Sequence, residues 1–366
     1  RLRWRCGWAF RMPMATELTR RQLAGWVGAG LLAAAAPAWA GSAPRLAASW
    51  RRPDHQHQVG WLRPDPSRGQ WQVEVALDVP TRAHGVWTGL SGELYAAARR
   101  PGDWLLRWQP GREPLWVWMP PERTLNGHVL LHPEGRVLLT TETDLDTGEG
   151  WVTVREAITL LPLKSWPTHG RDPHQLIWDP LHPDRLFVAN GGIETRPETG
   201  RQKLALDAMD ASLVCLDTRR GEVLGQWRLD DARLSLRHLA WSGDRLGVAL
   251  QAEHDDEAQR HAAPVLALLE PKGLRTVAFD RPLAGYGGDI AGTTEGFAVG
   301  CPRAGGVALH HRDGRPRGWV PLPEACALAA DAQGRLWMGG HPVAGKGAER
   351  LALPGLRLDN HWRLAG

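Results

Sequence analysis

The sequence predicts an all-β protein, a β-propeller most simply built from seven blades of four antiparallel strands. Three observations lead to this fold class. Helical periodicity is almost absent after residue 41, short apolar strands alternate with Gly, Asp or Pro turns, and similar hairpins recur at intervals of 40 to 50 residues. A four-stranded unit repeated at that spacing is typical of propeller blades. Two β-sandwiches are the alternative, but they would not explain the recurrence.

Six inner hairpins follow one another along the chain, each with alternating apolar residues on both sides of a turn. They occupy residues 84–100, 127–142, 173–192, 237–251, 288–302 and 326–340. Strands within residues 45–80 supply a seventh blade, and the segment LRLDN at 356–360 is expected to join it and close the ring. The 20 Trp residues suit packing on half-buried strand faces and between blades.

The first 40 residues are interpreted as a targeting segment. Residues 1–13 lack an initiator Met and read as an upstream extension, whereas residues 14–40 read as a twin-arginine signal peptide. The signs are the pair Arg20-Arg21, a modest apolar stretch and the AWA site before Gly41. The apolar stretch is too short for a good spanning helix. We therefore expect a periplasmic protein with no stable membrane insertion, folded as one domain over 41–366.

The net charge of +4 originates in that segment, since residues 1–40 hold six Arg and one Glu. The rest of the chain has 38 basic and 39 acidic residues, interspersed without a basic stripe, which argues against a nucleic-acid partner. Cys215, Cys301 and Cys326 are expected to be buried thiols, and no CxxCH haem signature occurs. Common catalytic motifs are also missing. Residues 253–261 read as an acidic surface loop.

A His precedes the inner strand in four units, and these four residues are 44, 46 and 64 apart: His84, His128, His174 and His238. Equivalent positions in a propeller surround the central channel, so the four imidazoles are expected to converge on one funnel. Further candidates at nearby loop positions are Arg82, Arg99, Glu142, Asn190, Glu194 and Arg237. An insertion at 190–210 lengthens the third interval and carries Glu194, Arg196, Arg201 and Lys203. It is either a functional loop or a clasp over the channel.

Three interpretations of the histidines stay open. Each His can tie its own loop to a neighbouring strand by hydrogen bonds. Alternatively, the ring binds a transition metal such as iron, or a haem-like ligand, because imidazole is a versatile metal ligand. The third interpretation is a polar pocket for an organic or anionic ligand, in which Arg side chains are natural partners of carboxylate or phosphate.

The chain from Arg45 onward resembles the bacterial family called domain of unknown function 1513. The resemblance rests on RAHG at 82–85, RRPG at 99–102, THGRDPHQL at 168–176, the long motif at 189–213, GYGGDIA at 285–291 and CPRAGG at 301–306. It implies a twin-arginine-exported propeller. Family members are commonly encoded beside imelysin-like iron-uptake proteins and di-haem-type proteins, which implies partners in iron acquisition. Thr143 and Ala205 depart from the family pattern, so the resemblance assigns them no ligand role.

The sequence therefore favours a periplasmic, non-catalytic binding propeller associated with iron or other metal acquisition. It would engage a metal, a small ligand or a partner protein at the His-lined face. An oxidoreductase or lyase that uses funnel His and Arg residues is the first alternative. A structural scaffold is the second.

Overall fold

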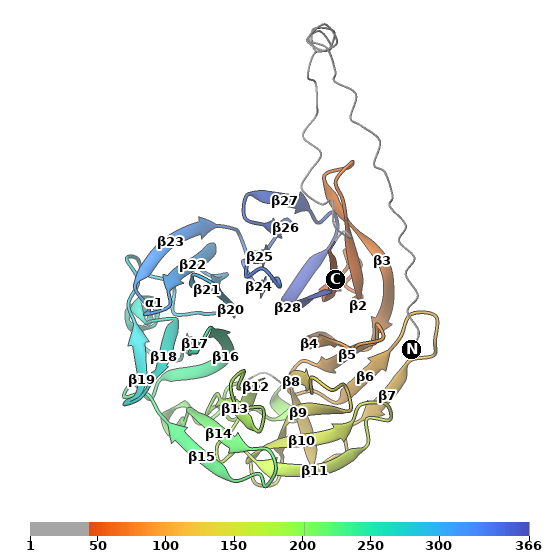
Figure 1. The fold of residues 1–366 in the computed structure, drawn as a ribbon. Helices are drawn as coiled ribbons and strands as arrows, with labels where there is room; N and C mark the ends of the chain where they lie inside the picture. The colour runs from red at the N-terminus through yellow and green to blue at the C-terminus, as the bar shows by residue number, and fades with distance from the viewer. Residues whose placement is uncertain (1–43, 201, 366) are drawn as a thin grey trace, which may run out of the picture. The chain divides into compact units, whose positions relative to one another are not determined.

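In the computed structural model, which describes residues 44–200 and 202–365, the strands form seven four-stranded antiparallel units around a central channel (Figure 1). This arrangement agrees with the predicted propeller. The expectations for residues 1–13 and 14–40, and Arg201, lie outside the described residues. No helix in the described part of the chain is long and apolar enough to span a membrane.

The blades are numbered here in chain order, each from its innermost strand outward. Blade 1 is β4 (Ala83–Thr88), β5 (Leu94–Ala98), β6 (Trp104–Trp108) and β7 (Leu115–Trp118). Blade 2 is β8 (Arg123–Leu131), β9 (Val137–Asp144), β10 (Gly150–Glu156) and β11 (Pro162–Pro167). Blade 3 is β12 (Pro173–Trp178), β13 (Arg185–Asn190), β14 (Ser212–Asp217) and β15 (Val223–Trp227). Blade 4 is β16 (Leu234–Ser242), β17 (Arg245–Ala252), β18 (Leu266–Glu270) and β19 (Gly273–Val277).

The remaining blades complete the ring. Blade 5 is β20 (Asp289–Thr293), β21 (Gly296–Cys301), β22 (Gly306–His311) and β23 (Pro316–Pro321). Blade 6 is β24 (Ala327–Ala330), β25 (Leu336–Gly339), β26 (Val343–Lys346) and β27 (Glu349–Ala352). Blade 7 is β28 (Arg357–Ala365), β1 (Arg45–Arg51), β2 (His57–Asp65) and β3 (Gln70–Val79). Each of the six predicted inner hairpins is thus the inner strand pair of one blade.

Blade 7 joins the two ends of the described chain. The C-terminal strand β28 pairs antiparallel with β1, with Leu364 opposite Leu46 and Trp362 opposite Ala48. Blades 6 and 7 form one eight-stranded sheet only because of a single parallel pair between β27 and β3. The pairing of β28 with β1 confirms the predicted closure of the ring by the C-terminal segment.

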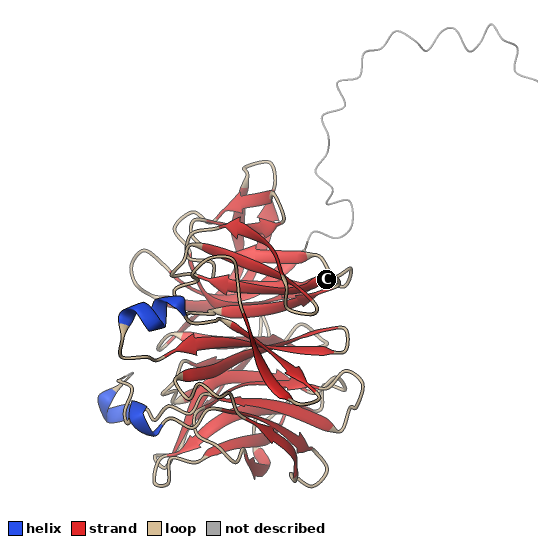
Figure 2. Ribbon diagram, turned by 90° about the vertical axis from the view of Figure 1, so that its left-hand side faces the viewer, coloured by secondary structure: helices blue, strands red, loops and turns tan. Residues whose placement is uncertain are grey.

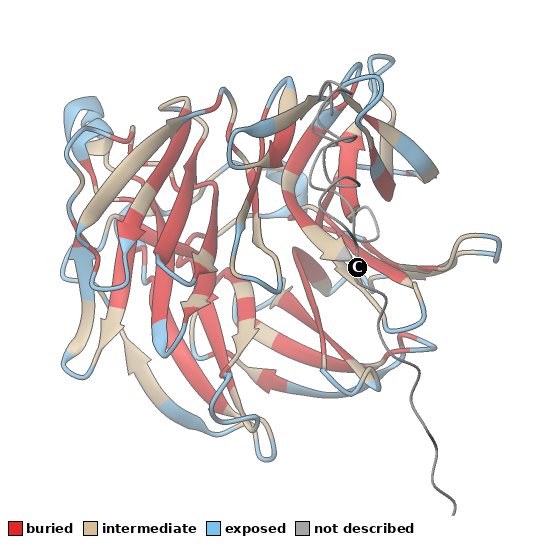
Figure 3. Cartoon of the chain, turned by 45° about the horizontal axis from the view of Figure 1, so that its top comes forward, coloured by how far each residue is buried: buried red, intermediate tan, exposed pale blue. Residues whose placement is uncertain are grey.

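The hydrophobic core consists of clusters that each lie between two neighbouring blades (Figure 3). One cluster joins blades 7 and 1 through residues such as Trp61 and Trp104, and another joins blades 3 and 4. Some indole N–H groups have partners across these interfaces, since Trp241 donates to the Trp178 carbonyl at 2.9 Å, whereas Nε1 of Trp61 is buried without a partner. Trp therefore supplies both apolar area and a hydrogen bond between blades, as its amphipathic ring allows. Cys215, Cys301 and Cys326 are free thiols.

The insertion between β13 and β14 contains two short 3-10 turns, η1 (Pro197–Thr199) and η2 (Leu206–Ala208). Residues 253–261, expected as a loop, instead include the helix α1 (Glu257–Ala262), because the Asp256 side chain caps it by accepting from Gln259 N at 2.7 Å. The helical segments lie on one face of the ring (Figure 2). Lys203 from the insertion reaches Glu253 near α1, so the insertion is strapped to blade 4.

The close approach of inner strands leads to a first prediction, that Gly292→Ala is strongly destabilising. A Cβ at Gly292 would lie 1.8 Å from the Trp241 carbonyl oxygen of β16, and backbone cannot retreat as a side-chain tip can. We expect a loss of about 2–3 kcal/mol in the free energy of unfolding, measured by urea denaturation. Gly318→Ala in β23 is the matched control, because its Cβ would meet nothing within 4 Å. Equal stability of the two variants would contradict the inferred tightness of the inner ring.

Candidate metal centre

Five buried histidines from five blades meet in the central channel. They are called the imidazole cluster: His84 on β4, His128 on β8, His174 on β12, His238 on β16 and His361 on β28. All five are between 1 and 8% exposed. The two other inner strands contribute Asp289 on β20 and the Leu328 backbone on β24, which are joined by a 2.9 Å hydrogen bond from Leu328 N–H to Asp289 Oδ2.

Each histidine of the cluster lies at an irregularity in the pairing of its inner strand. The register shifts between Ala83 and Val86 on β4, Leu125 and Val129 on β8, Pro173 and Leu176 on β12, and Leu236 and His238 on β16. On β28 the shift lies between the residues opposite Ala48 and Trp50, a stretch that includes His361. A bulge redirects a side chain that regular pleating would point into a blade interface. These register shifts lie at or beside the five histidines that meet in the channel.

Gly127 gives two of these side chains, His84 and His128, the room to pack against each other. Its φ is 97°, and a Cβ there would lie 2.9 Å from Cδ2 of His84. Glycine is therefore required immediately before His128, both for the backbone conformation and for the room that the His84 ring needs. With that room available, the ring centroids of His84 and His128 are 4.8 Å apart.

The imidazole nitrogens are close enough to share one ion. Ring centroids of neighbouring members lie 4.5 to 4.8 Å apart, from the His238–His361 pair to the His84–His128 pair. Nε2 of His174 is 3.0 Å from Nε2 of His238. One nitrogen from each of His84, His128, His174 and His238 lies within 4.8 Å of the others, and His238 and His361 form a second such group with Asp289.

Two carboxylates lie beside members of the cluster. Asp289 Oδ1 lies 3.2 Å from Nδ1 of His361, and Asp359 Oδ1 lies 3.5 Å from Nδ1 of His84. A carboxylate next to one ring nitrogen favours the proton there and leaves the other nitrogen as a lone-pair donor, which is the usual arrangement behind a metal-bound histidine. Asp289 is placed for this role at His361, whereas both ring nitrogens of His84 are buried without a hydrogen-bond partner, as is Nε2 of His361.

The electrostatics of the channel keep these imidazoles uncharged. Burial first, and then repulsion from neighbouring imidazoles and guanidiniums, holds the pKa of His84, His128, His174 and His238 well below the usual 6.5. A neutral imidazole is the form that binds metals. These four imidazoles are therefore in their ligating state at neutral pH.

The imidazole cluster separates two cavities. On one side, a channel cavity of about 370 Å³ runs between the inner strands and reaches His128, His361 and Asp289. On the other side lies a small polar cavity of about 20 Å³, called the arginine pocket. Its walls are His84, Arg99, Arg100, His174, Arg237, His238, Gln251, Tyr286 and Asn360.

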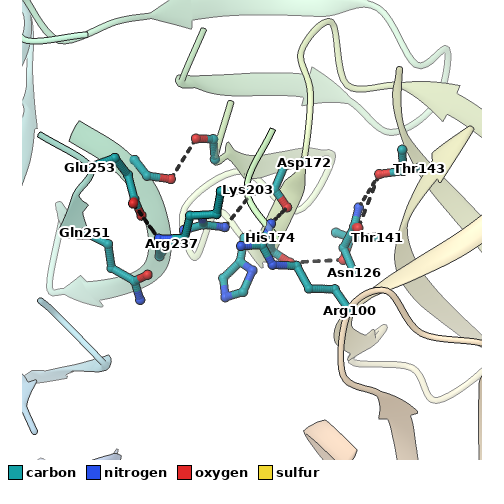
Figure 4. Close-up of polar contacts among 12 residues, drawn as sticks. Arg100, Asn126, Thr141, Thr143, Asp172, His174, Lys203, Arg237, Gln251 and Glu253 are labelled. Carbon is teal, nitrogen blue, oxygen red and sulfur yellow. Dashed lines mark hydrogen bonds and ion pairs between the residues drawn. The ribbon is translucent and has the colours of Figure 1, made fainter. Parts of the chain in front are cut away.

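Two guanidiniums share one carboxylate beside the arginine pocket. Arg237 Nη1 is 2.7 Å from Asp172 Oδ2, and Arg100 forms an ion pair with the other oxygen of the same carboxylate. Figure 4 shows His174 next to this triad, with Gln251 and Glu253 on the side of Arg237. Asp172 and His174 flank Pro173, so the sequence DPH carries both a ligand candidate and the carboxylate next to it.

The other residues predicted from the sequence are distributed more widely. Arg99 lines the arginine pocket, whereas Arg82 forms an ion pair with Asp359 and lines a separate cavity of about 340 Å³. Glu142 is buried in blade 2 and accepts from Arg155 Nη2 at 2.8 Å.

Asn190 and Glu194 also have partners outside the cluster. Asn190 donates to the Thr168 carbonyl at 3.0 Å, and Glu194 contacts Arg171 and Arg196. The structure therefore brings Arg99 and Arg237 to the imidazoles but gives Glu142, Asn190 and Glu194 partners within the blades and insertion.

Sequence reasoning missed His361, Asp289, Arg100 and Asp172. No shared motif marks His361, because HWRL at 361–364 has its Trp one residue after the His, whereas HGVW at 84–87 and HLAW at 238–241 have it three residues after. Arg100 stands beside the predicted Arg99, and nothing in the sequence distinguishes the two. Asp172 could be suspected only from its place one residue before Pro173.

The fold places the chain in the class of β-propellers. It is similar to a chain of Kuenenia stuttgartiensis hydrazine synthase at 12% identity and a TM-score of 0.57, covering 80% of this chain and 91% of that one. It is also similar to the Dos1 propeller at 8% identity and a TM-score of 0.52, covering 81% and 80% of the two chains. At such identities the likeness concerns the fold alone. Among curated proteins none matches this sequence.

Within that class, the chain belongs to the family described as "Protein of unknown function (DUF1513)", whose characteristic sequence pattern matches residues 77–365. The matched span begins in β3 and contains all five members of the imidazole cluster.

Proposed function

We propose that the protein is a non-catalytic binding propeller whose imidazole cluster holds one first-row transition-metal ion. The observation that carries this proposal is the set of buried imidazole nitrogens without hydrogen-bond partners, Nε2 of His84, His128 and His361, in one channel. Buried polar atoms are ordinarily paired, and each unpaired one costs roughly 1–3 kcal/mol. A single ion would satisfy Nε2 of His84 and of His128, which belong to the group with His174 and His238, whereas His361 belongs to the second group with His238 and Asp289.

The spacing of the nitrogens supports the same assignment. Imidazole nitrogens bind zinc at about 2.0–2.1 Å, so two nitrogens 3.0 Å apart, as in His174 and His238, can both contact one ion. Nitrogen-rich sites favour zinc, copper, iron and nickel over magnesium or calcium. Ligand type alone does not select among these metals, and availability in the compartment would decide the ion bound.

A periplasmic role in iron or other metal acquisition extends this proposal. It is supported by the twin-arginine leader predicted for residues 14–40 and by the family resemblance, whose members are associated with imelysin-like and di-haem-type proteins. In this role the propeller would hold the metal, or present it to such a partner, at the His-lined channel. Imidazole is consistent with iron as the ion.

The experiment is elemental analysis by mass spectrometry of protein exported through its own leader, with iron, copper, nickel and zinc measured together. We expect one ion per chain in the wild type. His84/His128/His174/His238→Ala should contain none, and single replacement of His174 or His361 should reduce the content.

A matched control separates loss of ligands from loss of any buried imidazole. His310→Ala removes a fully buried histidine of β22 whose Nδ1 contacts the Gly314 carbonyl, outside the cluster. This variant should keep its metal. Circular dichroism checks that each variant is folded. Metal-free wild type that also fails to take up iron, copper, nickel or zinc in vitro would refute the proposal.

A further inference from the structure

The arginine pocket carries an excess of buried positive charge. Arg100 and Arg237 share the single carboxylate of Asp172, and the side chains of Arg237 and Asp172 are 1% and 2% exposed. Two neighbouring cations have carboxylate partners of their own, since Lys203 pairs with Glu253 and Arg82 with Asp359. Counted by itself, the triad of Arg100, Arg237 and Asp172 has two positive charges and one negative charge.

Arg237 also has hydrogen-bond donors to spare. Its Nη1 binds Asp172, but its Nε and Nη2 are buried and have no hydrogen-bond partner. Unpaired donors on a buried cation are more costly than unpaired neutral ones. Arg237 lines the arginine pocket together with His174 and His238, so the same small cavity faces both a guanidinium and the imidazole cluster.

A metal ion would increase this imbalance. The imidazoles are neutral ligands, so a divalent ion bound by them keeps its full charge of about two units. That charge would lie near two guanidiniums in a region of low dielectric, where like charges repel strongly. An anion between the ion and Arg237 would offset the positive charge. It would also accept hydrogen bonds from Nε and Nη2 of Arg237, which have no partner.

We propose that the arginine pocket binds a small oxyanion, with one oxygen directed at the metal in the imidazole cluster and another accepting from Nε and Nη2 of Arg237. The ligand class is a carboxylate, carbonate or phosphate group, since guanidinium geometry fits these groups in bidentate fashion. A cavity of about 20 Å³ admits only a small group or the charged end of a larger ligand. This proposal rests on the proposed metal site and deepens it.

The test measures zinc affinity by competition with a chromophoric chelator, in buffer free of carbonate, phosphate and carboxylates. Bicarbonate, phosphate or acetate is then added in separate arms. For the wild type we expect at least one arm to tighten the apparent zinc dissociation constant by about tenfold, the size of an ordinary coupling between two sites. The arm that responds identifies which oxyanion the pocket accepts.

Two variants at the pocket should both lose the response to added anion but should differ in their zinc affinity. Arg237→Gln removes the free donors but leaves Asp172 paired with Arg100, so its zinc affinity should respond to no anion. Gln251→Glu places a carboxylate on the pocket wall, opposite Ser235 in the pairing of β16 and β17. It should bind zinc tightly without added anion and gain nothing from it. Arg228→Gln, an exposed partner of Asp210, is the control and should respond as the wild type does.

The outcomes separate the two proposals. Zinc binding that is indifferent to all three anions overturns the oxyanion site and leaves the metal site intact. If the protein binds no zinc and also no iron, copper or nickel, the metal site is overturned. Calorimetric titration of the metal-free protein with phosphate then tests whether the arginine pocket binds an anion by itself. Phosphate binding that is lost in Arg237→Gln would support an oxyanion site independent of metal. No phosphate binding would overturn it.

Discussion

Metal-free protein should lose several kcal/mol of folding stability when the pH is lowered from 7.5 to 5.5. The folded-state pKa of His84, His128, His174 and His238 lies well below 6.5, whereas the unfolded chain has the ordinary value. Below pH 6.5 the unfolded state therefore binds more protons than the folded state, and stability falls as pH falls. An imidazole still neutral at pH 5.5 destabilises the fold by about 1.4 kcal/mol, or roughly 5 kcal/mol for four.

Urea denaturation at a series of pH values measures this loss. Replacement of the four histidines by Gln should flatten the dependence between pH 7 and 5.5, whereas His310→Ala should leave most of it, since that residue lies outside the cluster. Carboxylates titrate equally in all variants. The difference between the variants in the slope of unfolding free energy against pH therefore measures the contribution of the imidazole cluster. Parallel slopes for wild type and the fourfold variant would show that the imidazoles are protonated in the folded state.

Removal of residues 357–366 should abolish cooperative folding. The segment is the innermost strand of blade 7, pairs with β1, and buries Trp362 beside β24. Loss of one buried Trp alone costs about 3–5 kcal/mol, a large part of the total stability of an ordinary domain. The truncated chain would also expose the unpaired edge of β1, which invites association with other chains. Thermal melts and size-exclusion chromatography measure both effects.

His361→Ala is the companion variant for this truncation. It keeps β28 and its pairing but removes one member of the imidazole cluster. We expect a cooperative melt and an elution volume unchanged from the wild type, with weaker metal binding. If the truncated chain instead melted cooperatively near the wild-type temperature, the strand would be dispensable and closure of the ring would contribute little to stability.

The fold could be predicted from the sequence because each hairpin is local: its turn and strand alternation are visible within about 20 residues, and comparison of successive hairpins shows the repeat. The convergence of His84, His128, His174 and His238 followed from the repeat in the same way. His361 escaped because β28 has no hairpin partner near it in the sequence, and its neighbour β1 begins at Arg45.

Other parts of the site depend on features that no local pattern records. The register shifts at or beside the five histidines arise from pairing in three dimensions, and regular alternation would have pointed several of these rings elsewhere. Glu142 looked like a channel residue by register, but the guanidinium of Arg155 on the adjacent strand pairs with it. The carboxylate of Asp172, just before blade 3, likewise pairs with Arg100, which follows β5 of blade 1, and with Arg237 on β16 of blade 4. These three residues are far apart in the sequence.

Closure through β28 has a consequence for the order of events in the life of the protein. His84 and His361 are 277 residues apart, so an ion held by both would cross-link nearly the whole described chain. Such a cross-link restricts the unfolded chain more than a short one does. It also means that the full ligand set exists only after the last strand has been synthesised and docked. Full metal binding would then occur only in a chain whose ring is complete. A chain that ends a few residues early would lack one of the ligands.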